Sequence, residues 1–193
     1  MQTKPVTILS TTTLDEADIA AGRAAGLAID VIPFIEVVLI DGPVIAEEVT
    51  HVAGMPATVI FTSIHAVRSV QRFVRGPVQW KMFCVGEITA GAAISAFPGS
   101  TLLDTAATAG ELANRIVASG TGDSAGITFF CGDHRRDELP SMVRSGGSTM
   151  KEIVAYQTIK TPHVIDNDYD GGIFFSPSAV QSFFSVNDAR RAR

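Results

Sequence analysis

The sequence predicts an α/β fold built on parallel sheets, and three observations support this. Strand-type segments alternate with helix-type segments along the chain. The strand-type runs, such as "TVIF" and "ITFF", are continuously apolar, as strands covered on both faces must be. A strand–Ser–helix unit also occurs twice. "IFTSIHAVRSVQ" at 60–71 and "IFFSPSAVQSFF" at 173–184 share six of their first eleven residues. Two similar α/β domains are therefore expected.

The chain begins with a strand and a helix. The run "VTILS" predicts a strand over 6–10, and "LDEADIAAGRAAG" predicts a helix over 14–26. Asp15 and Glu16 suit the positive end of the helix dipole. Gly26 suits the C-terminal cap of the same helix.

The next segment, 28–40, is extended and rich in β-branched residues, but Pro33 interrupts it. A central strand does not tolerate proline well, because proline cannot donate a ladder hydrogen bond. The segment is therefore predicted to form two short strands or an extended linker.

From residue 43 onward the alternation is regular, with Thr108 and Glu111 forming a capping-box pattern before one helix. Strands are predicted at 57–63, 80–87, 100–104, 125–133, 150–159 and 171–178, and helices at 43–54, 64–74, 88–97, 108–119, 135–146 and from 179 onward.

The repeat predicts a discontinuous first domain. Residues 58–159 contain four strand–helix steps and a closing strand, whereas the second copy of the repeat contains only the first step. Its partner elements must come from the N-terminal strand and helix. The predicted boundaries are 1–33 plus 160–193 for domain 1 and 36–156 for domain 2, with crossings near 31–37 and 154–160.

The bulk composition indicates a globular protein. Of the 193 residues, 46% are hydrophobic and 18% are charged, which is enough for a sizeable core. Apolar stretches are strand-sized, and the N-terminus lacks the apolar region of a signal peptide, so no membrane association is expected. Cys84 and Cys131 each end an apolar run, as buried thiols in a reducing compartment do. A cytoplasmic protein is expected.

The charge distribution argues against a nucleic-acid partner. The net charge is −5, and the only dense basic cluster is the terminal "ARRAR". An anionic small molecule remains compatible with this charge, because helix N-termini bind anions through backbone N–H groups.

Motifs for cofactors and metals are absent. The sequence contains no GxGxxG, P-loop, CxxC or GxSxG pattern, so no cofactor is expected. Cys131, Asp133 and His134 lie close together, but a closed zinc site needs four ligands and no second cluster exists. A buried thiol followed by a loop is the preferred interpretation, with no metal.

Ligand-binding residues are expected just after the strands, because parallel sheets bind ligands at the carboxyl ends of their strands. These positions are Thr62-Ser63, Gly86 to Thr89, Cys131 to Asp133, and Ser176 to Ser178.

Two serines and one histidine raise the question of covalent catalysis. Neither Ser63 nor Ser178 has a recognisable base, since His65 falls inside the following helix. Both serines are predicted to hydrogen-bond at a helix N-terminus, either as caps or toward a ligand.

Three further side chains each have two interpretations. Arg135 and Arg136 are predicted to open a helix, where they form a solvated first turn or one of them reaches a ligand carboxylate. Tyr156 lies in a crossing between the domains and either packs or donates a proton.

Five motifs in order resemble the uroporphyrinogen-III synthase family over residues 6–184. The family pattern is "FTS" with a following "AV", then "VG..TA", "G...R..LP", "Y.T" and "FSPSAV". In this chain these read Phe61-Thr62-Ser63 with Ala66-Val67, Val85 to Ala90, Gly132 to Pro140, Tyr156-Gln157-Thr158, and Phe175 to Val180.

The resemblance implies two flavodoxin-like α/β domains joined by a two-stranded β-ladder, the first domain being discontinuous. Relatives continue for some fifty residues after "FSPSAV", whereas this chain ends at residue 193. The first domain is therefore expected to be incomplete, with an exposed sheet edge. A monomer is expected, and association through that edge is the alternative.

The resemblance also implies an activity: cyclising hydroxymethylbilane to uroporphyrinogen III with inversion of ring D, loss of water and no cofactor. Tyr156 is then the general acid. The substrate-binding residues are Thr62, Ser63, Gly86, Thr89, Gly132, Arg135, Ser176 and Ser178.

There are three rival hypotheses. The first is a non-catalytic two-lobed protein that closes on a small anionic ligand, and the second is an inactive, shortened synthase. The third, a receiver-type signalling domain, is disfavoured, because the first strand is followed by Ser10-Thr11-Thr12-Thr13 instead of an acidic cluster.

Overall fold

Two sheets organise the chain, one of three strands and one of six. The structure is a computed structural model that describes residues 5–121 and 126–188. The chain divides into unit 1, Met1–Val37 with Thr158–Arg193, and unit 2, Val38–Gln157. Each unit is described by itself.

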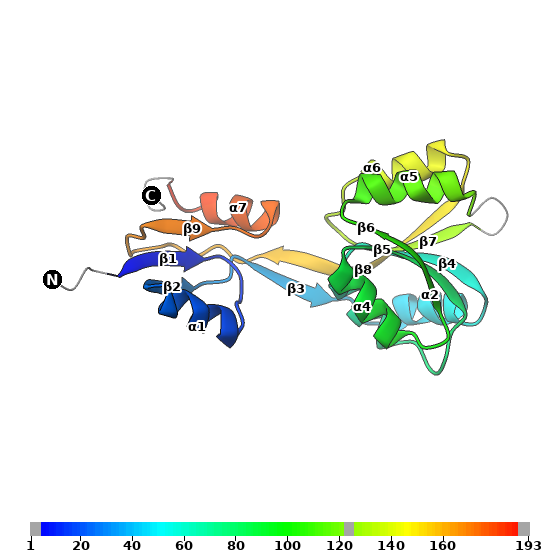
Figure 1. Ribbon diagram of the computed structural model, residues 1–193, viewed down its shortest axis with the longest axis horizontal. Coiled ribbons are helices and arrows are strands. Elements are labelled where there is room, and N and C mark those ends of the chain that lie inside the picture. Colours follow the sequence, from blue (N-terminus) through cyan, green and yellow to red (C-terminus); the bar gives the residue numbers. More distant parts are fainter. Residues whose placement is uncertain (1–4, 122–125, 189–193) are drawn as a thin grey trace. The chain divides into compact units, whose positions relative to one another are not determined.

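The elements follow the predicted alternation (Figure 1). The strands are β1 (Val6–Ser10), β2 (Leu27–Val31), β3 (Ile35–Leu39), β4 (Ala57–Phe61), β5 (Trp80–Val85), β6 (Thr101–Ala106), β7 (Ile127–Gly132), β8 (Met150–Lys160) and β9 (Gly171–Ile173). The helices are α1 (Glu16–Ala24), α2 (Pro43–Ala53), α3 (Ile64–Gln71), α4 (Glu87–Ala96), α5 (Ala109–Ser119), α6 (Glu138–Ser145) and α7 (Pro177–Phe184).

The larger sheet is doubly wound. Its order is β3-β8-β7-β4-β5-β6, and the five strands from β4 to β8 pair in parallel. Counted from β4 their order is 3-2-1-4-5, whereas flavodoxin has 2-1-3-4-5. The α/β prediction is confirmed. The strand order of unit 2, counted from β4, differs from that of flavodoxin, whereas the order β2-β1-β9 of the smaller sheet is that of the first three flavodoxin strands, 2-1-3. The chain reverses direction across the sheet between β4 and β7, which creates a switch point there.

Helices cover both faces of this sheet (Figure 1). Apolar residues of α2, α3 and α4 join one buried cluster, and those of α5 and α6 join a second. The strands supply both clusters in alternation: Phe61 of β4 belongs to the first, and Ile60 of the same strand belongs to the second. This alternation explains why the strands of unit 2 are continuously apolar in sequence.

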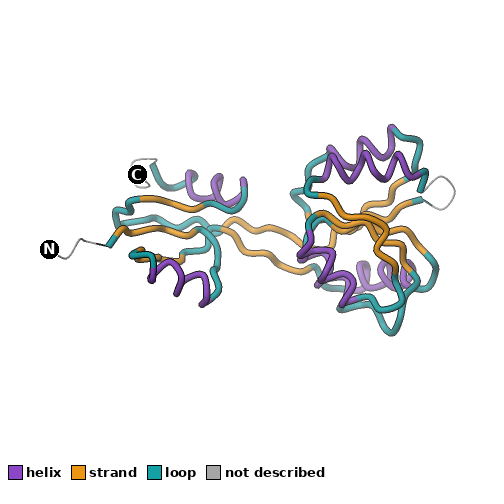
Figure 2. Tube along the Cα trace, viewed as in Figure 1, coloured by secondary structure: helices purple, strands orange, loops and turns teal. Residues whose placement is uncertain are grey.

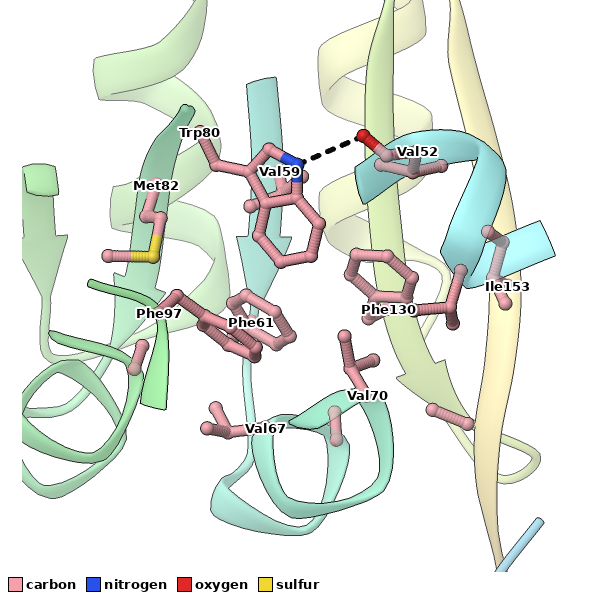
Figure 3. Packing of buried hydrophobic residues seen from close by; sticks show 14 of the residues in the cluster. Val52, Val59, Phe61, Val67, Val70, Trp80, Met82, Phe97, Phe130 and Ile153 are labelled. Carbon is pink, nitrogen blue, oxygen red and sulfur yellow. Dashed lines mark hydrogen bonds between the residues drawn. The ribbon is translucent and has the colours of Figure 1, made fainter. Parts of the chain in front are cut away.

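Aromatic rings fill the first cluster (Figure 3). Phe61 stacks on Phe97 and on Phe130, with ring centroids 5.4 and 5.3 Å apart. Trp80 lies 4.9 Å from Phe97 and is only 1% exposed. Its buried indole Nε1 donates a 3.1 Å hydrogen bond to the Val52 carbonyl at the end of α2. The bond satisfies the polar atom of the largest side chain in the core.

The smaller sheet has the order β2-β1-β9, and both pairings of β1 are parallel. Figure 2 shows the strands of both sheets in orange and the helices in purple. The N-terminal strand is therefore the sheet partner of the second repeat. The core of this unit contains Leu9, Phe34, Ile165, Tyr169, Ala179 and Phe183. Helix α1 contributes no buried residue.

The sequence repeat is also a structural repeat. Ser63 caps α3 and Ser176 caps α7, each through its side-chain oxygen. Ser69 and Ser182 lie 113 residues apart, and both are fully buried, with side-chain oxygens that have no hydrogen-bond partner among the described residues. The strand orders correspond as well: β1 lies between β9 and β2, as β7 lies between β4 and β8.

The segment after β2 pairs with β8. The Ile40 N–H donates to the Ala155 carbonyl, and the Thr161 N–H donates to the Phe34 carbonyl, both at 3.0 Å. Residue numbers rise along β3 as they fall along β8, so these strands run antiparallel. Pro33 separates β2 from β3, which confirms the prediction of two short strands.

One predicted helix start was wrong. Helix α6 begins at Glu138, so Arg135 and Arg136 lie in the turn before it. The Arg135 guanidinium forms an ion pair with Glu152 of β8 and donates a hydrogen bond to Asp137. The Asp137 carboxylate also accepts a 2.7 Å hydrogen bond from the Ser141 hydroxyl. Within the described ranges, no helix is long and apolar enough to cross a membrane.

Replacing the buried indole tests the core. Trp80→Phe removes the hydrogen bond to Val52 and leaves a cavity, so we expect the free energy of unfolding to fall by about 2–4 kcal/mol. Urea denaturation followed by circular dichroism measures this value. The control is Val44→Ala on α2, where the side chain is 72% exposed and a change within about 0.5 kcal/mol is expected. Equal stabilities of the two variants would contradict the packing described above.

Candidate active site

A cavity of about 450 Å³ opens at the carboxyl ends of the strands of unit 2. Residues on or directly after the five strands β4 to β8 contribute to it. Thr62 directly follows β4, and Tyr156 lies on β8. It therefore lies at the switch point, where doubly wound sheets bind ligands. Its walls are Thr62, Val85, Ala107, Thr108, Ala109, Phe129, Gly132, His134, Arg135, Arg136, Glu138, Leu139 and Tyr156.

Tyr156 packs against the last residue of β7. A Cβ atom added to Gly132 would lie 2.6 Å from Tyr156 Cζ and 2.8 Å from its phenol oxygen. Only glycine leaves room for the phenol there, so Gly132 has a steric role beneath the ring. The backbone also fixes this corner, because the Asp133 N–H donates to the Tyr156 carbonyl at 3.1 Å. Tyr156 is half-buried and presents its phenol to the cavity.

The first turn of α3 contacts the same tyrosine. The ring centroid of His65 lies 5.6 Å from that of Tyr156, at an interplanar angle of 53°. The Ser63 side-chain oxygen accepts a 3.2 Å hydrogen bond from the backbone N–H of His65 and so fixes the start of the helix. Burial lowers the pKa of His65, and the positive charge of Arg68 lowers this pKa further. The imidazole is therefore neutral at neutral pH.

Arg135 lines the cavity, but its charge is already engaged. Its guanidinium forms an ion pair with Glu152 and another with Asp137 at 3.2 Å. Burial acts to lower the pKa of Arg135, but the hydrogen bond and charge of Glu152 outweigh this and raise it. Arg144 contacts the second oxygen of Glu152 at 2.5 Å. This cluster ties the turn before α6 to β8, so a structural role for Arg135 has direct support.

Of the two arginines considered for a ligand carboxylate, Arg136 is the one that is absent from the predicted substrate-binding residues. It lines the cavity and is exposed, and no ion pair involves it in the part of the chain that the structure describes. The signal was available in the sequence, because the spacing G-x-x-x-R-x-x-L-P, counted from Gly132, places its arginine at 136.

The remaining predicted residues of unit 2 lie beside the cavity or on its wall. Thr62 is on the wall. Gly86 has a φ of +79°, which glycine adopts without strain, and it forms the turn into α4. Thr89 is only 7% exposed within the first turn of α4. Ser63 is engaged as a helix cap. Substrate contacts of Ser63, Gly86 and Thr89 stay predictions.

The two predicted serines of the second repeat belong to unit 1. The Ser176 side-chain oxygen accepts from the Ala179 N–H at 3.1 Å, so Ser176 is the cap of α7. Ser178 lies in the first turn of this helix and is not its cap, so of its two predicted roles the ligand contact stays a prediction. The ungapped repeat already aligns Ser63 with Ser176.

The candidate metal ligands of the sequence do not gather. Across residues 5–121 and 126–188, no group of three His, Cys, Asp or Glu side chains could hold a metal ion. Cys131 is buried, and its Sγ lies 3.7 Å from the Ile153 carbonyl. Burial, followed by the charge of Glu152, raises the pKa of this thiol to about 11. Cys131 is therefore a packed, protonated thiol.

The strand order and the cavity define a doubly wound α/β protein with a cavity at the switch point of unit 2, the place where such sheets bind ligands. A family model described as uroporphyrinogen-III synthase HemD matches residues 17–192. The chain therefore belongs to the uroporphyrinogen-III synthase family.

Solved structures show the same fold. A uroporphyrinogen-III synthetase from Helicobacter pylori is similar with a TM-score of 0.62 at 12% identity, covering 95% of this chain and 79% of the other. A mutant uroporphyrinogen III synthase from Thermus thermophilus has a TM-score of 0.55 at 14% identity. That match covers 81% of this chain and 64% of the Thermus chain, which is less than two thirds of its length. No curated protein sequence matches.

Adding one methyl group tests the contact beneath the phenol. Gly132→Ala places a Cβ within 2.6 Å of the Tyr156 ring, so we expect the ring to move away from β7. Overpacking of this kind costs about 1–3 kcal/mol of folding stability. A crystal structure and urea denaturation of the variant measure both effects.

The control is Gly91→Ala inside α4, where an added Cβ meets nothing within 4 Å. Alanine is the better helix former, so this change is expected to raise stability by about 0.5–1 kcal/mol. A Gly132→Ala variant with an unmoved Tyr156 ring and wild-type stability would refute the steric role of Gly132.

Proposed function

We propose that this chain cyclises hydroxymethylbilane to uroporphyrinogen III, with inversion of ring D and release of water, as a step of tetrapyrrole biosynthesis. Family membership supports the reaction. The single observation that supports a particular site for this reaction is the Tyr156 phenol on the wall of a cavity at the switch point. The sequence motif "Y.T" of the family falls on the same residue.

The reaction asks the protein mainly for geometry. The substrate loses its hydroxyl with help from the pyrrole nitrogen electrons and gives an azafulvene. Attack by the substituted carbon of the terminal ring gives a spiro intermediate, which fragments and closes with that ring inverted. Since the substrate also closes unaided to the uninverted isomer, catalysis rests on positioning. A site poor in nucleophiles suits this chemistry.

Tyr156 is the proposed general acid for the departing hydroxyl. A phenol is protonated at neutral pH and can donate that proton. Gly132 leaves room for the ring, and the hydrogen bond from the backbone N–H of Asp133 to the Tyr156 carbonyl holds this part of β8 in place. The cavity of about 450 Å³ has the size of a pocket for a drug-sized ligand, so we propose that it receives one end of the longer tetrapyrrole.

Carboxylates of the substrate are the proposed partners of Arg136 and of the backbone N–H groups at the start of α5. Arg136 lines the cavity, whereas the charge of Arg135 is engaged by Glu152. Thr108 and Ala109, at the start of α5, are also on the wall. Both features attract anions in a chain of net charge −5.

We further propose that the two units are related domains, 1–33 with 160–193 and 36–156, joined by the antiparallel pair of β3 and β8. The correspondence of strand orders and helix caps between the units supports a common ancestry. A cytoplasmic monomer without nucleic-acid partners is the proposed state, in keeping with the negative charge and the buried free cysteines.

Removing the phenol hydroxyl tests the function. With hydroxymethylbilane as substrate, the wild-type chain should form the type III isomer faster than the spontaneous type I isomer appears, as measured by chromatographic separation of the oxidised products. Tyr156→Phe should lower kcat by about a hundredfold or more, since general acid catalysis contributes about 10²–10⁴-fold. A folded variant with wild-type kcat would remove Tyr156 as the acid. Absence of type III product from the wild type would refute the proposed activity.

Comparing the two arginines tests the carboxylate contact. Arg136→Gln should raise KM about tenfold or more at unchanged stability, because one charge-assisted hydrogen bond contributes about 1.5–3 kcal/mol. Arg135→Gln should instead lower the free energy of unfolding, by about 1 kcal/mol, because Glu152 loses one of its two arginine partners. Steady-state kinetics and urea denaturation separate these effects. The reverse pattern would assign the carboxylate contact to Arg135.

A further inference from the structure

We propose that His65 is a positioning residue for the reaction: its imidazole holds Tyr156 and donates a hydrogen bond to the phenolate that remains after proton transfer. This inference rests on the proposed function of Tyr156. His65 is absent from the five motifs that identify the family, and its ring contact with Tyr156 is known only from the structure.

The imidazole of His65 packs against the ring of Tyr156. The imidazole touches the Tyr156 ring at a centroid distance of 5.6 Å, yet His65 does not line the cavity. It therefore acts on the tyrosine and not on the substrate. Gly132 and His65 contact the same ring from β7 and α3, so neighbours on two elements restrain the phenol.

The start of α3 is itself held in place. The Ser63 side-chain oxygen accepts a hydrogen bond from the backbone N–H of His65, and the neighbouring Ala66 and Val67 are buried in the core. The imidazole thus projects from an anchored helical turn. Hydrogen bonds to catalytic groups in free enzymes are often long and tighten only when substrate binds. The ring contact keeps the imidazole next to the Tyr156 side chain before substrate binds.

The charge state of the imidazole fits this role. Burial and the nearby Arg68 keep His65 neutral at neutral pH by lowering its pKa. A neutral imidazole still carries one N–H donor. It also adds no positive charge that would bind a substrate carboxylate, in contrast to Arg136. Loss of His65 is therefore expected to change kcat and to leave KM unchanged.

The proton balance shows where the hydrogen bond is needed. The Tyr156 O–H bond breaks as its proton joins the departing hydroxyl, which leaves as water. The substrate is left as an azafulvenium cation that keeps its pyrrole N–H proton. The phenolate persists until the unsubstituted carbon of the inverted ring attacks the methylene carbon, forms the final carbon–carbon bond and releases its own proton. That proton returns to the phenolate, so no other acid or base is consumed. Between these steps the Tyr156 oxygen is negatively charged, and an adjacent N–H donor stabilises it.

Two substitutions at His65 separate hydrogen bonding from packing. His65→Phe keeps a ring against Tyr156 but has no N–H, whereas His65→Gln keeps an N–H donor but has no ring. We expect His65→Phe to lower kcat about ten- to hundredfold at unchanged KM. His65→Gln should stay within about threefold of wild type. The assay is formation of the type III isomer from hydroxymethylbilane, with circular dichroism to verify folding.

The control is His51→Phe, which makes the same exchange at an exposed position on α2 and should leave kcat unchanged. Wild-type kcat in His65→Phe overturns the inference, and so does a kcat below about a tenth of wild type in folded His65→Gln. If His65→Phe does not fold, His65→Leu, which also lacks an N–H donor, replaces it, and wild-type kcat in that variant overturns the inference. A wild-type chain that forms no type III isomer refutes the proposed function and this inference with it, whereas an active wild type with an unaffected His65→Phe refutes only the inference.

Discussion

The pairing of β4 with parallel strands on both sides is the constraint on which unit 2 depends. β4 binds β5 through one edge and β7 through the other, and its residues from Val59 to Phe61 are fully buried. The helix after β5 packs on one face of the sheet, and the helix after β7 packs on the other face. A crevice therefore forms between them, at the carboxyl end of β4. The cavity, Gly132 and the first turn of α3 all lie at this opening.

Sequence patterns predicted most of this scaffold, because the scaffold depends on local rules. Apolar strand runs, the interruption at Pro33 and the capping oxygens of Thr108 and Ser63 each act within a few residues. The repeat added one long-range relation, the pairing of β9 with β1. The strand order was inferred only from the resemblance, because periodicity does not specify which strands become neighbours. The smaller sheet has its strands in the inferred order, whereas unit 2 departs from that order when it is counted from β4.

The candidate site was less predictable, because its side chains are selected by contacts across the sheet. The position after each strand was a good guide, and Thr62, Gly132, Arg135 and Tyr156 do line one cavity. Sequence alone could not reveal that Glu152 on a neighbouring strand engages Arg135. The contact between His65 and Tyr156 was equally hidden, since 91 positions separate these residues in the sequence.

Comparison of the two units shows why the contact beneath the phenol belongs to unit 2. The repeat aligns Ile173 with Ile60, so their strand partners, Ser10 on β1 and Phe129 on β7, correspond. Counted from these partners, the place of Gly132 is taken in unit 1 by Thr13, an exposed residue beyond the end of β1. In unit 2 the strand β7 continues to Gly132, whose missing side chain leaves the space that Tyr156 occupies. A strand that extends further at its carboxyl end and finishes in glycine is therefore the local difference that gives the phenol its place in unit 2.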